Sequence, residues 1–218
     1  MPFIVFEGGE GTGKSTQSSL LVKSLKASGM SVVETREPGG TPLAEDIRRV
    51  FKSVPDSGDV PTPRTELLLV MAARCQHIEK LIKPALSNDQ WIVCDRFLDS
   101  SYVYQGVRGK LAKQDIDQIA APLLGTLQPD LTFVLVVPQE VSKIRVAARA
   151  GTQADRLDTE LLNDTTLQEA FEHLCTSNTP YPDGRVPKRL LIDGSGSVET
   201  VASEIRDAIN KYFGLNLP

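Results

Sequence analysis

The sequence has few cysteines, few histidines and no long apolar run, and each shortage excludes a class of protein. Its 218 residues include 3 Cys, at positions 75, 94 and 175. This odd number and wide spacing fit neither a disulfide framework nor a cysteine-ligated metal site. The best uncharged apolar run, residues 131–138, is far shorter than the roughly 18 residues of a membrane-spanning helix. We therefore expect no membrane partner.

An excess of positive charge is also missing. Lys and Arg number 24 against 28 Asp and Glu, which gives a net charge of −4. A mildly acidic chain gives no reason to expect a nucleic-acid polymer as a partner. Any anion site must therefore be formed by a local group of positive or N–H donors. Glu7 interrupts the first apolar residues, so we expect no signal peptide and a location in the reducing cytoplasm.

Short apolar runs alternate along the chain with longer helical patterns. The runs predict strands at 3–6, 31–34, 91–94, 131–137 and 189–192. The helical patterns lie at 14–28, 42–53, 64–86, 97–106, 113–126, 139–150, 161–175 and 197–213. Because the runs are continuous rather than alternating, we expect strands covered by helices on both faces. This order predicts an α/β fold with a five-stranded parallel sheet, in a single domain spanning residues 1–218.

A glycine-rich loop follows the first predicted strand. It reads Glu7-Gly8-Gly9-Glu10-Gly11-Thr12-Gly13-Lys14-Ser15-Thr16, which contains the pattern G-x-x-x-x-G-K-[ST]. Its glycines let backbone N–H groups point inward around an anion, and the helix that begins at Lys14 adds the positive end of its dipole. Residues 8–16 therefore predict the nucleotide cradle of a P-loop NTPase fold rather than a chance glycine-rich turn. Lys14 would reach the β- and γ-phosphates of ATP, and the Ser15 hydroxyl would bind Mg²⁺.

A carboxylate that orients the Mg²⁺ shell is expected at the end of another buried strand. Asp95 follows the predicted strand at 91–94. An Asp in this position is in general more often a helix cap, but beside a phosphate loop we assign it to the metal. Arg96 comes next, at the carboxyl edge where ligands of open α/β sheets bind.

Two predicted helices carry polar side chains on faces that suit a second ligand. On the first, Phe97, Ser101, Tyr104 and Gln105 share one face, which suits a base and a sugar but equally fits a half-buried helix. On the second, Arg74 falls within an apolar stripe. A guanidinium there is costly unless it is paired or reaches a polar cleft, so Arg74 either forms a structural ion pair or, as we favour, binds a ligand.

Further arginines fit phosphoryl transfer. Arg36 and Glu37 end the second predicted strand in a Pro-Gly-Gly turn, and Arg48 lies at the edge of an apolar helix stripe. Arg149 and Arg156 flank or occupy a polar segment at about 150–160. Charges on such a segment are usually only solvated, but in a kinase it would be a short mobile lid whose arginines close over the donor phosphates.

The two histidines form no catalytic arrangement in the sequence. His77 and His173 lie on separate predicted helices, so we expect them to serve in packing or to lie at the surface.

Taken together, these stretches resemble the thymidylate kinase family. The matching stretches are 6–16, Thr35-Arg36-Glu37-Pro38-Gly39-Gly40-Thr41, Met71-Ala72-Ala73-Arg74, Cys94-Asp95-Arg96-Phe97, 100–106, Pro129-Asp130-Leu131-Thr132 and Asp155-Arg156-Leu157-Asp158. They occur in order over nearly the whole chain. The phosphate loop alone would indicate only an NTPase, whereas the Arg-Glu-Pro-Gly-Gly-Thr, Asp-Arg-Phe and Tyr-Gln-Gly stretches are specific in combination.

The resemblance implies an ATP-dependent nucleoside monophosphate kinase. It would move the γ-phosphoryl of ATP to the 5′-phosphate of dTMP, giving dTDP and ADP in dTTP biosynthesis, and family members are commonly homodimers. Thr12 stands where some members carry a basic residue, so the sequence resembles the bacterial type, whose basic residues are in the lid. The catalytic residues implied are Lys14, Arg96, Arg149 and Arg156.

The resemblance also implies where the acceptor nucleotide binds. Arg48 and Arg96 would hold its phosphate, with Arg36 and Glu37 nearby. Glu10 would receive the 3′-hydroxyl, and Tyr104 would crowd the 2′ position. The thymine would meet Arg74, Ser101 and Gln105.

One position departs from the family pattern. Val70 stands where the family usually has an aromatic ring that stacks on thymine, and such stacking is worth about 1–3 kcal/mol in single-strand binders. We therefore predict a weaker or broader base preference, unless Phe97 or another ring substitutes. The alternatives that stay open are a kinase of another deoxynucleoside monophosphate such as dUMP, and a P-loop switch or ATPase without an acceptor.

Overall fold

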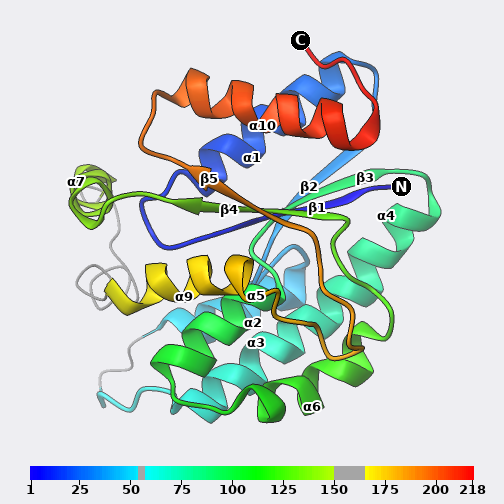
Figure 1. Cartoon of the computed structure of the whole chain (residues 1–218). Helices are drawn as coiled ribbons and strands as arrows, with labels where there is room; N and C mark the ends of the chain where they lie inside the picture. Colours follow the sequence, from blue (N-terminus) through cyan, green and yellow to red (C-terminus); the bar gives the residue numbers. More distant parts are fainter. Residues whose placement is uncertain (54–56, 150–164) are drawn as a thin grey trace.

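Five parallel strands form the centre of the fold in the computed structural model (Figure 1). The structure describes residues 1–53, 57–149 and 165–218, without the side chains of residues 149 and 165. The strands lie in the order β2-β3-β1-β4-β5. Their bounds are Phe3–Glu7 (β1), Val32–Arg36 (β2), Trp91–Asp95 (β3), Leu131–Val136 (β4) and Arg189–Asp193 (β5). The predicted five-stranded parallel sheet is confirmed, with each strand within two residues of its predicted bounds.

Helices fill the connections between the strands, and a further helix follows β5. Their bounds are Lys14–Ala27 (α1), Pro42–Lys52 (α2), Pro63–His77 (α3), Lys83–Ser87 (α4), Leu98–Ser101 (α5), Lys113–Leu124 (α6), Gln139–Arg149 (α7), Thr165–Thr176 (α9) and Val198–Phe213 (α10). Two helices begin with a threonine cap followed by proline: the hydroxyls of Thr41 and Thr62 accept from the N–H groups of Ala44 and Thr65. Proline suits the first helical position because its fixed φ is already helical.

Two of the predicted helices contain wider, π-helical turns. The helix predicted at 64–86 consists of α3, a π-helical segment η1 (Ile78–Ile82) and α4. The helix predicted at 97–106 is the short α5 followed by a π-helical segment η2 (Tyr102–Arg108). Apolar periodicity located both helices but cannot distinguish the two kinds of turn, because a single wide turn barely shifts the pattern.

Each face of the sheet has its own hydrophobic core. Phe3 and Val5 of β1 point into a core shared with α3, α6 and α9, whereas Ile4 and Phe6 point into a core shared with α1 and α10. Figure 1 shows α1 and α10 together on one side of the sheet and α2, α3, α6 and α9 on the other. This alternation follows from the two-residue period of a strand.

Helices cover both faces of the sheet, as expected, and the burial of the strands decreases toward the sheet edges. The central strand β1 is buried throughout, but β2 and β5 are partly exposed along their length. An edge strand has a neighbour on one side only, so its outer residues meet solvent. Among the described helices, none is both long and apolar enough to cross a membrane.

Candidate active site

The phosphate loop connects β1 to α1, and its shape depends on glycine. Gly8, Gly11 and Gly13 have φ values of 136°, 72° and 97°, a region that side chains rarely tolerate. A Cβ on Gly8 would overlap the carbonyl oxygen of Leu135 in β4, and one on Gly11 would lie 2.7 Å from the carbonyl oxygen of Ser142 in α7. The loop therefore lies so close to β4 and α7 that only residues without a side chain fit at Gly8 and Gly11.

Lys14 and Ser15 begin α1 at the bottom of this loop. The Lys14 ammonium donates to the carbonyl of Gly9 at 2.6 Å, and the Ser15 hydroxyl donates to Asp95 Oδ2 at 2.5 Å. Burial and the nearby guanidinium of Arg96 lower the pKa of Lys14 to about 8, although Glu10 and Asp95 oppose the shift. Lys14 thus lacks a fully compensating anion in this structure, which suits it to receive a phosphate.

Asp95 and Ser15 fit a magnesium site. Asp95 Oδ1 is buried and has no hydrogen-bond partner among the described residues. Within the same part of the chain, no group of three or more His, Cys, Asp or Glu side chains could hold a metal. One carboxylate with a neighbouring hydroxyl matches the way Mg²⁺ is usually held, mainly by water and substrate phosphates.

Arg96 joins the phosphate loop to the second half of the site. Its guanidinium donates to the Gly8 carbonyl at 3.0 Å, pairs with the carboxylate of Glu10, and lies 5.1 Å from the centroid of the Tyr104 ring. Burial alone would raise the pKa of Glu10, but Arg96 and Lys14 outweigh it and lower the pKa to about 2. Glu10 therefore stays ionised, and it accepts hydrogen bonds at any physiological pH.

The backbone of Arg96 adopts an unusual conformation. Its φ is 74°, in the left-handed region that favours glycine. Its N–H donates to the carbonyl of Phe6, which ties the turn to β1. The strained turn directs the guanidinium back over the phosphate loop.

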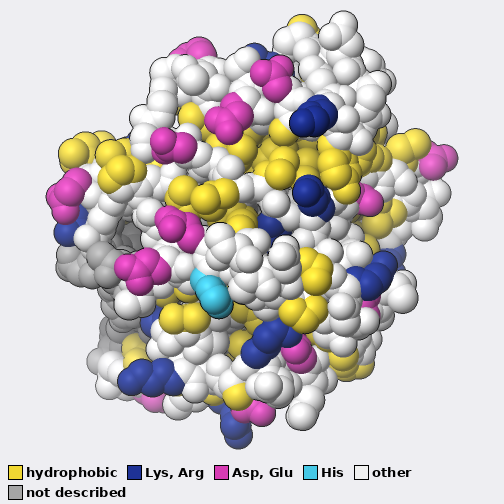
Figure 2. All heavy atoms as spheres, in the orientation of Figure 1, with side chains coloured by type: hydrophobic (Ala, Val, Ile, Leu, Met, Phe, Trp, Pro, Cys, Tyr) yellow, Lys and Arg dark blue, Asp and Glu magenta, His cyan; other side chains and the backbone are white. Residues whose placement is uncertain are grey.

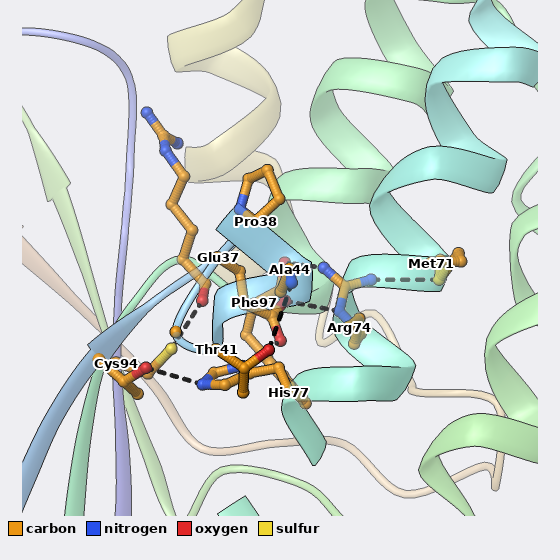
Figure 3. Close-up of polar contacts among 12 residues, drawn as sticks. Glu37, Pro38, Thr41, Ala44, Met71, Arg74, His77, Cys94 and Phe97 are labelled. Carbon is orange, nitrogen blue, oxygen red and sulfur yellow. Dashed lines mark hydrogen bonds and ion pairs between the residues drawn. The ribbon is translucent and has the colours of Figure 1, made fainter. Parts of the chain in front are cut away.

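Arg74 of α3 lies at the centre of a buried polar cluster (Figure 3). Its Nε donates to Glu37 Oε2 at 2.6 Å, and its other nitrogens donate to Ser101 Oγ at 3.0 Å and to the Phe97 carbonyl at 2.9 Å. The side chain is 1% exposed. Arg74 forms the structural ion pair that the sequence left open, and it also lines the cleft described next.

A cleft of about 1220 Å³ runs from the phosphate loop to Arg74. At the phosphate loop it is lined by residues 10–17 and by Gly194, Gly196 and Val198. The predicted acceptor residues that line it are Glu37, Arg48, Val70, Arg74, Arg96, Ser101, Tyr104 and Gln105. Segments far apart in the sequence thus supply one continuous cavity, large enough for two nucleotides.

The thymidylate kinase family model matches residues 6–182. The chain belongs to the thymidylate kinase family. A thymidylate kinase from Bradyrhizobium sp. (strain ORS 278) is 40% identical over 212 residues, which are 96% of this chain and 89% of that protein. Another, from Geobacter sulfurreducens, is 40% identical over 95% of both chains. The crystal structure of thymidylate kinase from Ehrlichia chaffeensis superposes with a TM-score of 0.71 at 29% identity, covering 95% of this chain and 98% of that one.

Membership in the thymidylate kinase family confirms the P-loop NTPase fold and makes the chain an ATP-dependent phosphotransferase. The predicted site residues can now be placed one by one. Arg36 does not line the cleft. Its guanidinium pairs with Glu45 Oε2 at 3.0 Å and is more than half exposed, whereas Arg48 lines the cleft and donates to the Pro38 carbonyl at 2.8 Å.

The position of the missing thymine-stacking ring is also defined. Val70 is largely buried and lines the cleft, as do Phe51 and Phe97. The Phe97 ring is held in the core by an edge contact of 5.1 Å to Phe3 and lies 5.3 Å from the Arg74 guanidinium. Phe97 therefore packs against Arg74, and the other aromatic side chains that line the cleft among the described residues are Phe51 and Tyr104.

The roles of Arg149 and Arg156 in a lid remain predictions. Arg156 and the segment at about 150–160 lie outside the described residues, and the side chain of Arg149 is not described either. The preceding helix α7 does reach the phosphate loop, because Ser142 Oγ donates to the Glu10 carbonyl at 2.7 Å.

Sequence reasoning missed the hydrogen bonds of two buried residues next to the cleft, Glu7 and His77. Glu7 is buried and accepts from the N–H groups of Phe97 and Ser100 at 2.7 and 3.1 Å and from the Ser100 hydroxyl at 2.6 Å. It fixes the start of α5, and so the segment that carries Arg96. The one available signal was a carboxylate at the end of an otherwise apolar strand.

His77 is the second missed residue. Its exposed fraction is 0%, and it contacts Glu37 Oε1 at 3.0 Å and Thr35 Oγ1 at 2.8 Å. The expectation of a packing or surface role missed both hydrogen bonds, because its partners lie about 40 residues away in the sequence. His173, in contrast, is exposed on α9 as expected.

Proposed function

We propose that the chain transfers the γ-phosphoryl of ATP to the 5′-phosphate of dTMP, giving dTDP and ADP. One observation carries the proposal: Lys14 and three acceptor-side arginines, Arg48, Arg74 and Arg96, line the same cleft. A P-loop switch or ATPase has no second anion to bind and would have no use for this second set of arginines.

The reaction needs positioning more than acid–base chemistry. The acceptor phosphate is already anionic, so one of its oxygens attacks the γ-phosphorus directly while the bond to the β–γ bridging oxygen breaks and ADP leaves. Lys14 and Arg96 supply fixed positive charge to the oxygens on which negative charge spreads. Mg²⁺, held by Ser15 and Asp95, would neutralise the donor phosphates. Arg149 and Arg156 would close over them and exclude water.

The acceptor side explains a preference for a deoxyribonucleotide. Glu10 is ionised and can accept from the 3′-hydroxyl, and Tyr104 lies beside Arg96, where its ring would crowd a 2′-hydroxyl. The hydroxyl of Tyr104 is buried without a hydrogen-bond partner among the described residues. Arg74, Ser101 and Gln105 would face the base.

We also propose a cytoplasmic homodimer of single-domain subunits. The described cysteines are all free, as expected in a reducing compartment. The helices α2 and α3 pack against one another and expose Leu43, Val50 and Leu68, each about half accessible. Light scattering should give twice the chain mass, and Val50→Lys should lower it. A monomer mass for the native chain would contradict the dimer.

A coupled assay of ADP release tests the reaction. With ATP and Mg²⁺, addition of dTMP should accelerate ADP release far more than dCMP, dGMP or dAMP. A preference for dUMP would favour the alternative substrate, since a single methyl group is worth only about 1–3 kcal/mol in a pocket. ADP release that no monophosphate accelerates would refute the kinase and leave an ATPase.

A further inference from the structure

We propose that Thr35 and His77 form a positioning relay that holds Glu37, and through it Arg74, in the orientation that selects the acceptor base. The inference rests on the proposed function and goes beyond it, since neither Thr35 nor His77 lines the cleft. They would be positioning residues that act on the ligand through others.

The relay is a continuous chain of hydrogen bonds from the sheet edge to the cleft (Figure 3). It runs from Thr35 Oγ1 to His77 Nε2 at 2.8 Å, from His77 Nδ1 to Glu37 Oε1 at 3.0 Å, and from Glu37 Oε2 to Arg74 Nε at 2.6 Å. Arg74 and His77 are three residues apart on α3 and so share one face. Glu37 therefore receives both side chains from the same helix.

The chemistry of the groups sets the direction of each bond. An ionised carboxylate only accepts, so His77 must carry its proton on Nδ1. The contact between Nε2 and the Thr35 hydroxyl at 2.8 Å holds the other side of the ring and so fixes the ring orientation. Burial alone would raise the pKa of Glu37, but Arg74 and His77 outweigh it and lower the pKa, so the carboxylate stays charged.

The contacts of Arg74 leave one donor for a ligand. A guanidinium has five N–H groups. In the described part of the chain, four hydrogen bonds go to Glu37, Met71 Sδ, Ser101 and the Phe97 carbonyl, and only one of them comes from Nη2. The second N–H of Nη2 is therefore available to a base oxygen, and its direction depends on how Glu37 holds Nε.

This arrangement predicts what the relay selects. A guanidinium offers donors only, so it favours a pyrimidine with a 4-oxo group and disfavours one with a 4-amino group. dUMP and dCMP form the matched probe pair, because they differ around this position and share the sugar and the phosphate. If a hydrogen bond of the relay is removed, Arg74 can change its orientation. The preference for dUMP over dCMP should then fall.

Variants of His77 separate positioning from folding. His77→Leu removes both hydrogen bonds, whereas His77→Asn places an amide nitrogen near the Nδ1 position and keeps the donor to Glu37. We expect His77→Leu to lower the ratio of kcat/KM for dUMP over dCMP about 10-fold, mainly through the KM of the acceptor, with the KM of ATP unchanged. His77→Asn should restore most of the ratio.

Thr35 provides a gentler second test. Thr35→Val removes the hydroxyl without changing the shape of the side chain, and Thr35→Ser keeps the hydroxyl as the matched control. Thr35→Val should lower the dUMP to dCMP ratio about 3-fold, and Thr35→Ser should not. Thermal unfolding of each variant shows whether it is folded.

The outcomes distinguish the relay from the proposed function. If the native chain phosphorylates pyrimidine monophosphates but folded His77→Leu and Thr35→Val keep the native ratio, the relay is refuted and the cluster is structural only. If the native chain phosphorylates no monophosphate, the proposed function fails first. A fallen ratio with His77→Asn rescue supports the relay.

Discussion

Glu7 shows how a single buried carboxylate can organise a site without meeting a ligand. It lies at the end of β1 and accepts three hydrogen bonds from the start of α5, as described above. Burial and the charge of Asp99 raise the pKa of Glu7 to about 7. The group therefore changes charge near neutral pH in the folded protein.

This raised pKa predicts a pH dependence of stability. Between pH 4.5 and 7, the folded state holds a proton that the unfolded state releases, so the free energy of unfolding should fall as pH rises through this window. The full loss, present above pH 7, is on the order of 3 kcal/mol. Glu7→Gln should remove this dependence. Urea unfolding of both proteins at pH 5 and pH 8 measures it, and identical pH profiles would contradict the shift.

Val70 predicts how the base pocket can be tightened. Val70→Phe adds a ring at the position where the family usually stacks one on thymine, so the Kd of dTMP should fall by a factor of about 10, in line with about 1–3 kcal/mol for base stacking. Calorimetric titration with dTMP measures it.

Val186→Phe is the matched control for this substitution. It makes the same change at an exposed position outside the cleft and should leave the Kd unaltered. Unchanged or weaker binding by Val70→Phe would mean that the cleft wall is already filled by Phe51 or Phe97.

Residue-level predictions succeeded where the signal is local. The phosphate loop could be predicted because its glycines, Lys14 and Ser15 are close together in the sequence. Asp95 could be predicted as part of the site because the ends of parallel strands meet at one edge of the sheet. Glu7 and His77 were not, because their partners lie about 40 to 90 residues away and no local pattern marks a buried hydrogen bond. The sequence could place Glu37 at the site but not show that Arg74 and His77 occupy both of its oxygens.

At the scale of elements, the turn between β2 and α2 is packed as tightly as the phosphate loop. Gly40 has a φ of 85°, and a Cβ there would lie 2.5 Å from Thr35 Oγ1 and 2.7 Å from His77 Nε2. The turn thus presses against the relay. Gly40 is required both by its backbone conformation and by this close approach.

Gly40→Ala should therefore cost more than its backbone conformation explains. Gly184 has a φ of 82° with nothing within 4 Å of its Cβ position, so Gly184→Ala reports the backbone term alone, about 1–2 kcal/mol. We expect Gly40→Ala to cost at least about 1–3 kcal/mol more through overpacking, and to lower the dUMP to dCMP ratio. Denaturant unfolding of both variants checks this, and equal costs would contradict the overlap.

The starts of two helices could be predicted from the sequence. The helices predicted at 42–53 and 64–86 begin at Pro42 and Pro63, each directly after a threonine whose hydroxyl caps the helix. The π-helical segments could not be predicted, because a wider turn shifts the apolar pattern by only one residue. The edge positions of β2 and β5 could not be predicted either, because they depend on the order of strands in the sheet, which a single sequence does not show.

At the scale of the whole molecule, the net charge of −4 is compatible with an anion site because basic side chains outnumber acidic ones along the cleft. Figure 2 shows acidic and basic side chains interspersed over one face. Lys14, Arg48, Arg74 and Arg96 instead line one cleft. The composition excluded a basic surface, and only the fold shows where the positive charge is gathered.

One buried ion pair connects distant parts of the molecule. Arg189 at the start of β5 donates to both oxygens of Asp99 in α5 at 2.7 and 2.8 Å, and it also donates to the Thr179 carbonyl. Both side chains are almost fully buried. The pair joins the edge strand and the proline-containing segment before it to the helix that follows Arg96.

Arg189→Met should destabilise the protein by about 3–5 kcal/mol, because it leaves the Asp99 charge buried without a partner. Adding Asp99→Asn removes that charge and should recover part of the loss. A double-mutant cycle in urea measures the coupling. Additive costs would show that the two side chains do not stabilise each other.

The left-handed backbone of Arg96 has a consequence for how such a chain can change over generations. Glycine would fit this φ without strain, but Arg96→Gly would also remove the ion pair with Glu10 and the hydrogen bond to the Gly8 carbonyl. The lost ion pair costs more than the relieved backbone strain, so selection for stability and selection for turnover both retain arginine. Libraries screened only for heat resistance should therefore keep Arg96 despite its left-handed backbone.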